Sequence, residues 1–149
     1  MRRILPWLAF TLLLAAAVHI AVVVALPTVI MARVVQVVGA EAQGRITHGD
    51  RPDETARRVV RPSPDLLYSI CVYDVSKNPL KITTGNPTGT YWSVSFFADN
   101  TDNFFVLNDT TAKGQPATIL LIGQGQQLPS QDGSMTVTSA PSATGLVLF

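Results

Sequence analysis

The sequence predicts a mainly β protein, an antiparallel β-sandwich or partial barrel behind one N-terminal transmembrane helix. Residues 4–32 form a run of 29 residues without a charge, which is long enough to cross a bilayer. After the connector, short segments rich in β-branched and aromatic residues alternate with turn residues, as in β-sheet domains. These features divide the chain into an anchor (1–33), a connector (34–64) and a β-rich domain (65–149).

The composition excludes several classes of protein. The 149 residues carry 11 Lys and Arg against 10 Asp and Glu, for a net charge of +1, and 47% of them are hydrophobic. Such a chain is neither disordered nor built to neutralise nucleic acid phosphates. Cys71 is the single cysteine, which excludes an intramolecular disulfide and cysteine-rich zinc or iron–sulfur sites. We expect no cofactor and no nucleic acid partner.

The apolar run has the length of a membrane-spanning helix. Pro6 and Pro27 bracket 20 residues, which span about 30 Å at about 1.5 Å per residue, the hydrocarbon thickness of a bilayer. A secretory signal peptide is the alternative, since Ala40-Glu41-Ala42 is typical of a small-residue cleavage site. The apolar segment of a signal peptide has only about 7 to 15 residues. The sequence therefore favours an uncleaved anchor that contacts the lipid bilayer through residues 4–32.

The orientation of this helix rests on its flanking arginines. Arg2 and Arg3 precede the run, and Arg33 and Arg45 follow it, so the two sides are nearly balanced. A short basic tail is costly to translocate, which favours an amino terminus in the cytoplasm. The β-rich domain is then expected outside the cytoplasm.

The connector begins with apolar residues and ends with prolines. Val34 to Val38 favour a short continuation of the helix, and the composition then changes to Gly, Arg, Asp, Thr and Pro up to Pro64. We expect the part from Glu41 to Pro64 to be a linker or an arm draped over the domain.

Seven strands are predicted after the connector, separated by Asx, proline and glycine turns. They are Leu66–Val75, Leu80–Thr84, Thr90–Ala98, Asn103–Leu107, Thr118–Ile122, Met135–Thr138 and Gly145–Phe149. Their spacing indicates an antiparallel meander folded into a sandwich or partial barrel.

Alternation along the aromatic strand assigns its two faces. Trp92, Val94 and Phe96 share one face, which we expect to be core, and Tyr91 and Phe97 lie on the other face. An exposed Tyr91 or Phe97 could line a pocket.

No catalytic residue and no metal site is predicted. A nucleophilic Cys71 needs a base, and His48, the only histidine outside the apolar run, lies in the connector, which would have to fold back over a strand. Cys71 shares a strand face with Tyr73 and should be buried. The acidic turn Asp99–Asp102 lacks the glycine and the terminal glutamate of a calcium loop.

Four polar residues surround the first predicted strand and are the candidate ligand-binding residues. Asp65 and Tyr68 lie at its start, and Tyr73 and Asp74 lie at its end. A tyrosine and carboxylate cluster could perform acid–base chemistry. Its alternative role is strand-end hydrogen bonding and turn capping.

A series of motifs recurs in one order along this region. It comprises Pro62 to Ser69 (PSPDLLYS), Tyr73 to Ser76 (YDVS), Asn78-Pro79, Thr90 to Ser93 (TYWS) and Asp99 to Phe104 (DNTDNF). This series resembles the bacterial domain of unknown function 1254 family, in its short membrane-anchored form. The resemblance implies a bacterial protein and no activity for individual residues. With the expected anchor and orientation, this places the chain in the bacterial inner membrane with its domain in the periplasm.

Two function classes remain open. The first is a noncatalytic, single-pass envelope protein whose β domain binds a protein partner or a small ligand. The second is an accessory or hydrolase-like enzyme that uses Asp65, Tyr68, Tyr73 and Asp74.

The C-terminal segment has the composition of an interior strand. Gly145–Phe149 either inserts into the sheet or presents an open edge that could pair with a protein partner. Leu146 and Leu148 should face away from Val147 and Phe149, and one of these pairs should pack against Trp92 and Phe96.

Overall fold

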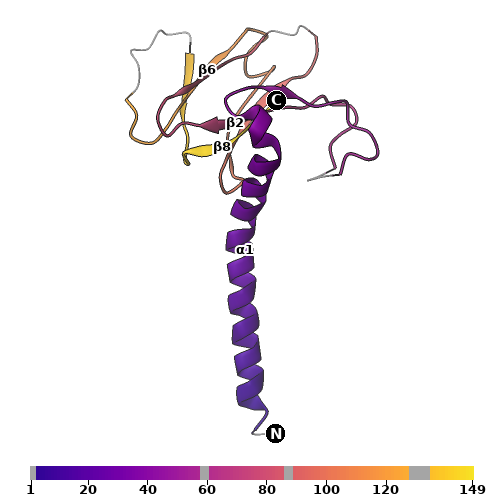
Figure 1. Ribbon diagram of the computed structural model, residues 1–149, viewed down its shortest axis with the longest axis vertical. Coiled ribbons are helices and arrows are strands. Elements are labelled where there is room, and N and C mark those ends of the chain that lie inside the picture. The colour runs from indigo at the N-terminus through magenta and orange to yellow at the C-terminus, as the bar shows by residue number, and fades with distance from the viewer. Residues whose placement is uncertain (1–2, 58–60, 86–88, 128–134) are drawn as a thin grey trace.

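A long helix stands out from a β domain in the computed structural model of the protein (Figure 1). The structure describes residues 3–57, 61–85, 89–127 and 135–149. Arg2 of the basic tail and the predicted turn residues 86–88 and 130–134 lie outside this part of the chain.

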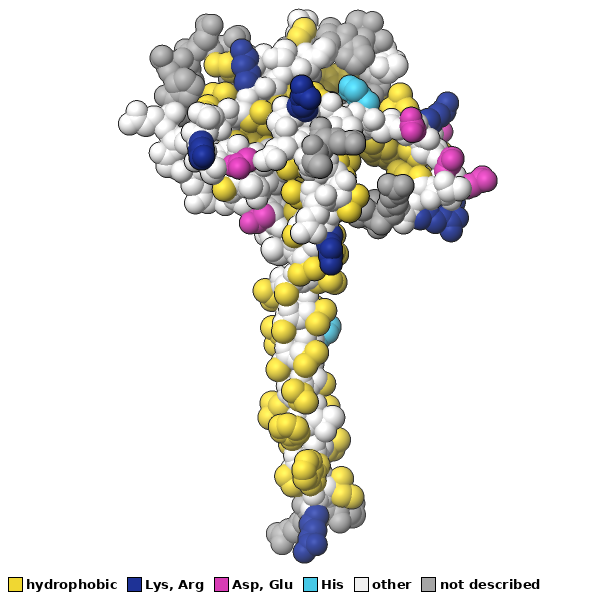
Figure 2. All heavy atoms as spheres, viewed as in Figure 1, with side chains coloured by type: hydrophobic (Ala, Val, Ile, Leu, Met, Phe, Trp, Pro, Cys, Tyr) yellow, Lys and Arg dark blue, Asp and Glu magenta, His cyan; other side chains and the backbone are white. Residues whose placement is uncertain are grey.

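Helix α1 runs from Leu5 to Ala42, over 38 residues. Pro6 occupies the first turn, where its missing N–H costs no hydrogen bond, whereas Pro27 lies inside the helix. Large apolar side chains are exposed all along the helix below the β domain, and they cover the face of it that Figure 2 shows. Leu5–Gly39 is long and apolar enough to cross a membrane, although a signal sequence near an N-terminus passes the same test.

Eight strands in two sheets form the β domain, and they do not close into a barrel among the described residues. They are β1 Thr47–His48, β2 Ser69–Asp74, β3 Leu80–Thr83, β4 Ser93–Ala98, β5 Asn103–Asn108, β6 Thr118–Ile122, β7 Met135–Ser139 and β8 Thr144–Leu148. The five-stranded sheet has the order β1-β2-β8-β4-β5, and the three-stranded sheet has the order β3-β6-β7. The predicted mainly β sandwich is confirmed.

The predicted meander is wrong in its connections. The chain passes back and forth between the sheets, so that β2 pairs with β8 and β3 pairs with β6. One pair, β6 with β7, is parallel. Parallel neighbours need a long crossover of about a dozen residues or more, and residues 123–134 provide this length.

The core lies between the two sheets. Tyr73, Phe96 and Val147 of the larger sheet meet Ile119 and Leu121 of the smaller one, and all five are fully buried. Each large apolar side chain buried in this way stabilises the fold by about 1.5–3 kcal/mol.

The last turns of α1 cover the outer face of the five-stranded sheet. Met31 and Ala42 are buried against Val72 of β2 and Leu146 of β8. The chain leaving the helix is also tied to β2, because the Gly44 N–H donates to the Val72 carbonyl at 3.0 Å. Strands β2 and β8 are therefore apolar on both faces.

A short strand that the sequence did not predict lies within the connector. Thr47 and His48 of β1 pair antiparallel with Ile70 and Ser69 of β2. The N–H of Gly49 continues this pairing by donating to the Tyr68 carbonyl at 2.9 Å. The connector therefore folds back over the first long strand.

Strand β8 lies in the middle of the five-stranded sheet, between β2 and β4. Val147 and Phe149 belong to the core cluster that includes Phe96 and Trp92, whereas Leu146 and Leu148 pack toward the helix. This confirms the predicted assignment of faces. Both edges of β8 are paired within the chain, so the strand has no free edge for the predicted protein partner.

Candidate functional site

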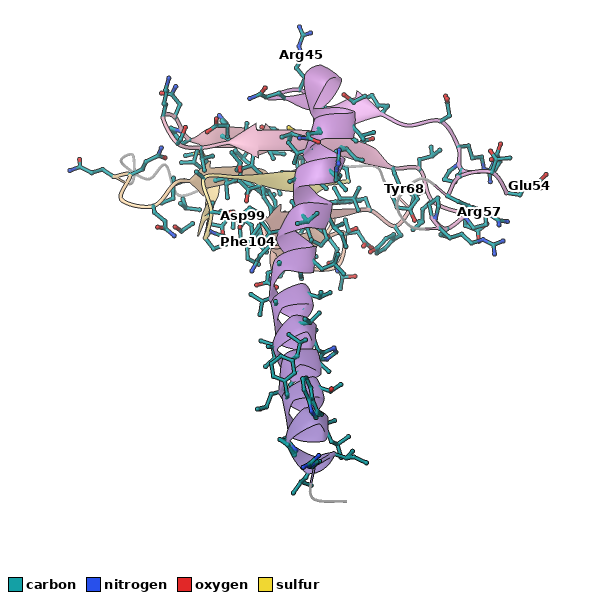
Figure 3. All side chains as sticks on the ribbon, turned by 60° about the horizontal axis from the view of Figure 1, so that its bottom comes forward. Arg45, Glu54, Arg57, Tyr68, Asp99 and Phe104 are labelled. Carbon is teal, nitrogen blue, oxygen red and sulfur yellow. The ribbon has the colours of Figure 1, made fainter. Side chains whose placement is uncertain are left out.

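A cavity of about 630 Å³ opens at the end of the sandwich where β8 ends and β2 and β4 begin. Both sheets contribute to it, since Thr83 of β3 lines it together with Val94 of β4 and Phe149. Tyr68, which lines the cavity, lies on the side of the domain from which the arm with Glu54 and Arg57 projects (Figure 3). Volumes of about 300–1,000 Å³ are typical of small-molecule sites.

The rim and one wall of the cavity are apolar and aromatic. Leu67 and Tyr91 lie at the rim and are 71% and 62% exposed, and Ile46 and Leu66 beside them are also exposed. Trp92 is half-buried and joins the core cluster to the cavity. Its indole N–H has no hydrogen-bond partner among the described residues.

The polar side chains of the cavity include a histidine and serine pair. The register of β1 and β2 places His48 opposite Ser69, and Nδ1 of His48 lies 2.7 Å from Oγ of Ser69. A serine hydrogen-bonded to an imidazole is the first part of a nucleophilic site. No carboxylate of the described residues hydrogen bonds to this imidazole, so the orienting third group of a triad is missing there.

Two of the four predicted site residues line this cavity. Asp65 and Tyr68 lie in the loop that precedes β2. Ser63 holds this loop, because its N–H donates to the Tyr68 hydroxyl at 3.1 Å and its hydroxyl accepts from the Asp65 N–H at 3.4 Å.

The other two predicted residues lie elsewhere. Tyr73 is in the core, where its hydroxyl donates to the Phe97 carbonyl at 3.2 Å and burial raises the pKa of its phenol. Asp74 is exposed and caps a turn, accepting from the hydroxyl and the N–H of Ser76 at 2.6 and 2.9 Å. These hydrogen bonds lower the pKa of Asp74. The four residues therefore do not form one cluster.

Cys71 is buried, as the sequence predicts. Burial raises the pKa of its thiol, which opposes formation of the reactive thiolate. The connector does fold back over β2, but it brings His48 to Ser69 and not to Cys71. Within the described residues, no group of three or more metal-ligating side chains lies together.

The sequence alone did not identify His48, Ser69 and Trp92 as cavity residues. The pairing that joins the first two involves only two residues of β1, which is too short to leave a periodic signal. Trp92 is predicted to be a core residue, and it does contact the core cluster. Its exposed neighbour Tyr91 lines the cavity, a role that the sequence left open for Tyr91 and Phe97.

The protein is therefore a two-sheet β-sandwich that is joined to a long apolar helix and has a cavity at one end. Residues 43–149 match the family described as "Protein of unknown function (DUF1254)", so the chain belongs to that family and the resemblance of its motifs is confirmed. No curated protein matches the sequence.

Two crystal structures share the fold. The VPA0106 protein from Vibrio parahaemolyticus has a TM-score of 0.54 and 15% identity, over 58% of this chain and 22% of that one. An uncharacterized protein from Burkholderia cenocepacia has a TM-score of 0.51 and 13% identity, over 71% of this chain and 30% of that one. The chain thus spans less than a third of either protein, and at these identities the likeness concerns the fold alone.

Proposed function

We propose that the protein is a noncatalytic, single-pass envelope protein whose β domain binds a small ligand in the cavity beside Tyr68 and Ser69. The cavity carries this proposal, because it combines a suitable volume, aromatic walls and a few polar groups. A small ligand is favoured over a protein that adds a strand, since both edges of β8 are already paired.

Helix α1 acts in this proposal as an uncleaved anchor in the bacterial inner membrane. Removal of the helix by a signal peptidase after Ala42 would take away Met31 and Ala42, which cover Val72 and Leu146. The outer face of the five-stranded sheet would then expose a contiguous apolar surface to water. Retention of the helix is therefore favoured by the packing of the fold, and the basic tail favours a periplasmic domain.

Ligand binding is testable with tryptophan fluorescence. Trp7 and Trp92 are the two tryptophans, so Trp7→Phe leaves Trp92 as the reporter in the cavity. In the full chain in phosphatidylcholine vesicles, para-bromobenzyl alcohol should quench this variant in a saturable way, because bromine is a contact quencher. Quenching that rises linearly with the concentration of the alcohol, with no saturation, would show that the cavity does not bind it.

A hydrolase-like enzyme is a second candidate, and the 2.7 Å contact between Nδ1 of His48 and Oγ of Ser69 favours it. In that reaction Ser69 would attack the carbonyl of an ester while His48 accepts the serine proton. His48 would pass this proton to the departing alcohol, which leaves an acyl-serine, and water would then hydrolyse the acyl-serine to release the acid and restore Ser69. The full chain should then hydrolyse para-nitrophenyl acetate, and Ser69→Ala should abolish a burst of para-nitrophenol. Equal rates for the two proteins would exclude this candidate.

A further inference from the structure

We propose that the ligand of the cavity is a single-chain amphiphile with an uncharged, hydroxylated head, taken from the adjacent bilayer. This inference rests on the proposed function of α1 as an anchor and of the cavity as a binding site. Three observations carry it: the height at which the helix holds the domain, the apolar rim, and the charges around the cavity.

The helix holds the domain directly on the headgroup layer. The 20 residues between Pro6 and Pro27, which match the hydrocarbon thickness, end at Leu26, and Met31 is already buried against the sheet five residues later. At about 1.5 Å per residue this interval is about 7.5 Å, comparable to the roughly 5–8 Å of headgroup region on each side of a bilayer. Because α1 continues unbroken through this interval, the domain is not separated from the membrane by a tether.

The rim of the cavity is suited to an apolar chain. Ile46, Leu66, Leu67 and Tyr91 are large, exposed and part of the cavity lining. Exposed apolar side chains that gather around a cavity mark a binding surface and lose water when it is filled. An acyl chain would contact both this rim and the wall formed by Trp92, whereas a small polar metabolite would leave the rim exposed.

The charged residues around the cavity favour an amphiphile with an uncharged head group. Neither lysine nor arginine occurs among the described residues that line it, and Asp65 is their only acidic residue. A carboxylate or phosphate head would therefore meet the like charge of Asp65 and no lysine or arginine among these lining residues. Hydroxyl groups could instead donate to Asp65 and exchange hydrogen bonds with the pair of His48 and Ser69.

The experiment uses the Trp7→Phe variant of the full chain in phosphatidylcholine vesicles, with dibromostearoyl monoglyceride as the probe. We expect saturable quenching of Trp92 by the monoglyceride, and an apparent affinity about tenfold lower for dibromostearic acid, which has the same chain and an anionic head. Equal or stronger binding of the acid would overturn the proposed head. Equal quenching by dibrominated phosphatidylcholine would show contact with the bulk bilayer and overturn the proposed site.

Two matched variants locate the binding. Thr83 is exposed and lines the cavity, so Thr83→Phe should fill it and weaken binding of the monoglyceride about tenfold or more. Thr136 is an exposed strand residue away from the cavity, so Thr136→Phe should bind as the parent does. Equal effects of both changes would place the ligand elsewhere.

The outcomes separate this inference from the proposed function. Binding of para-bromobenzyl alcohol without binding of the monoglyceride would overturn the amphiphile and leave the small-ligand function in place. Binding of neither probe would overturn both.

Discussion

Tyr73 and Gly145 fit closely together across the β2 and β8 pair, where they lie directly opposite each other. A Cβ atom at Gly145 would collide with the Phe97 carbonyl oxygen and with the phenol of Tyr73, and the first of these is backbone that cannot rotate away. The same Phe97 carbonyl accepts the Tyr73 hydroxyl. At this point of the core, glycine is required for space.

Gly145→Ala should therefore destabilise the protein by about 1–3 kcal/mol through overpacking. Gly85→Ala is the matched control, because a Cβ atom there meets nothing within 4 Å, and it should change the free energy of unfolding by less than about 0.5 kcal/mol. Urea unfolding followed by Trp92 fluorescence, with Trp7→Phe in both chains, measures both. Equal midpoints for the two variants would contradict the close packing of Tyr73.

Cys71 is 3% exposed, and the raised pKa of its thiol disfavours the thiolate. Iodoacetamide should label the native protein slowly and the urea-unfolded protein rapidly. Cys71→Ser should cost about 1–3 kcal/mol, because it buries a hydroxyl in an apolar core. Native labelling as fast as that of the unfolded chain would show that the strand is open at this position.

Asp74 makes the free energy of unfolding depend on pH in the acid range. Its pKa is lowered from 3.8 by the hydrogen bonds from Ser76. A lowered pKa in the folded state stabilises the protein above the ordinary pKa of the group, and this contribution is lost as the pH falls through the folded value. Asp74→Asn should therefore show a smaller loss of stability between neutral pH and pH values below 3.8. Parallel pH profiles for variant and parent would contradict the capping role.

Helix α1 is attached to the domain where its last turns pack on the outer face of the five-stranded sheet, a contact that we call the joint. Leu146 is 8% exposed and packs in this joint, whereas Leu67 at the cavity rim is 71% exposed. Leu146→Ala should cost about 2–4 kcal/mol, since it leaves a cavity beneath the helix. Leu67→Ala makes the same chemical change and should stay within about 0.5 kcal/mol of the parent in thermal or urea unfolding. A neutral Leu146→Ala would mean that the helix does not cover the sheet.

The strands were predictable from the sequence where one face is buried and the other is not. In β4, buried Val94, Phe96 and Ala98 alternate with less buried neighbours, and the predicted core face is the observed one. The order of the strands was not predictable in this way, because β8 is apolar on both faces and its two partners are distant in sequence. The cavity depends on that order, since its polar pair arises from β1 and β2 and its aromatic wall from β4.

In the whole molecule, the family match and helix α1 cover two different parts of the chain, and the fold packs these two parts together. The match begins at residue 43, directly after α1 ends at Ala42. The final turns of α1 nevertheless complete the packing of the sandwich by covering Val72 and Leu146. The helix is therefore both a possible span, from its length and composition, and a structural part of the β domain.

This joint leads to a prediction about the intact protein in a bacterial cell. If α1 is an uncleaved anchor, the chain keeps its amino terminus and resists extraction from membranes by alkaline carbonate. Alkaline phosphatase fused after Phe149 should be active, because that enzyme requires the periplasm, whereas a fluorescent protein that matures only in the cytoplasm should stay dark at this position and be bright at the amino terminus. The physical reason is the basic tail with Arg3, which is costly to translocate. A soluble chain beginning at Gln43 would instead identify a signal sequence, and the reverse pattern of reporter activity would place the cavity in the cytoplasm.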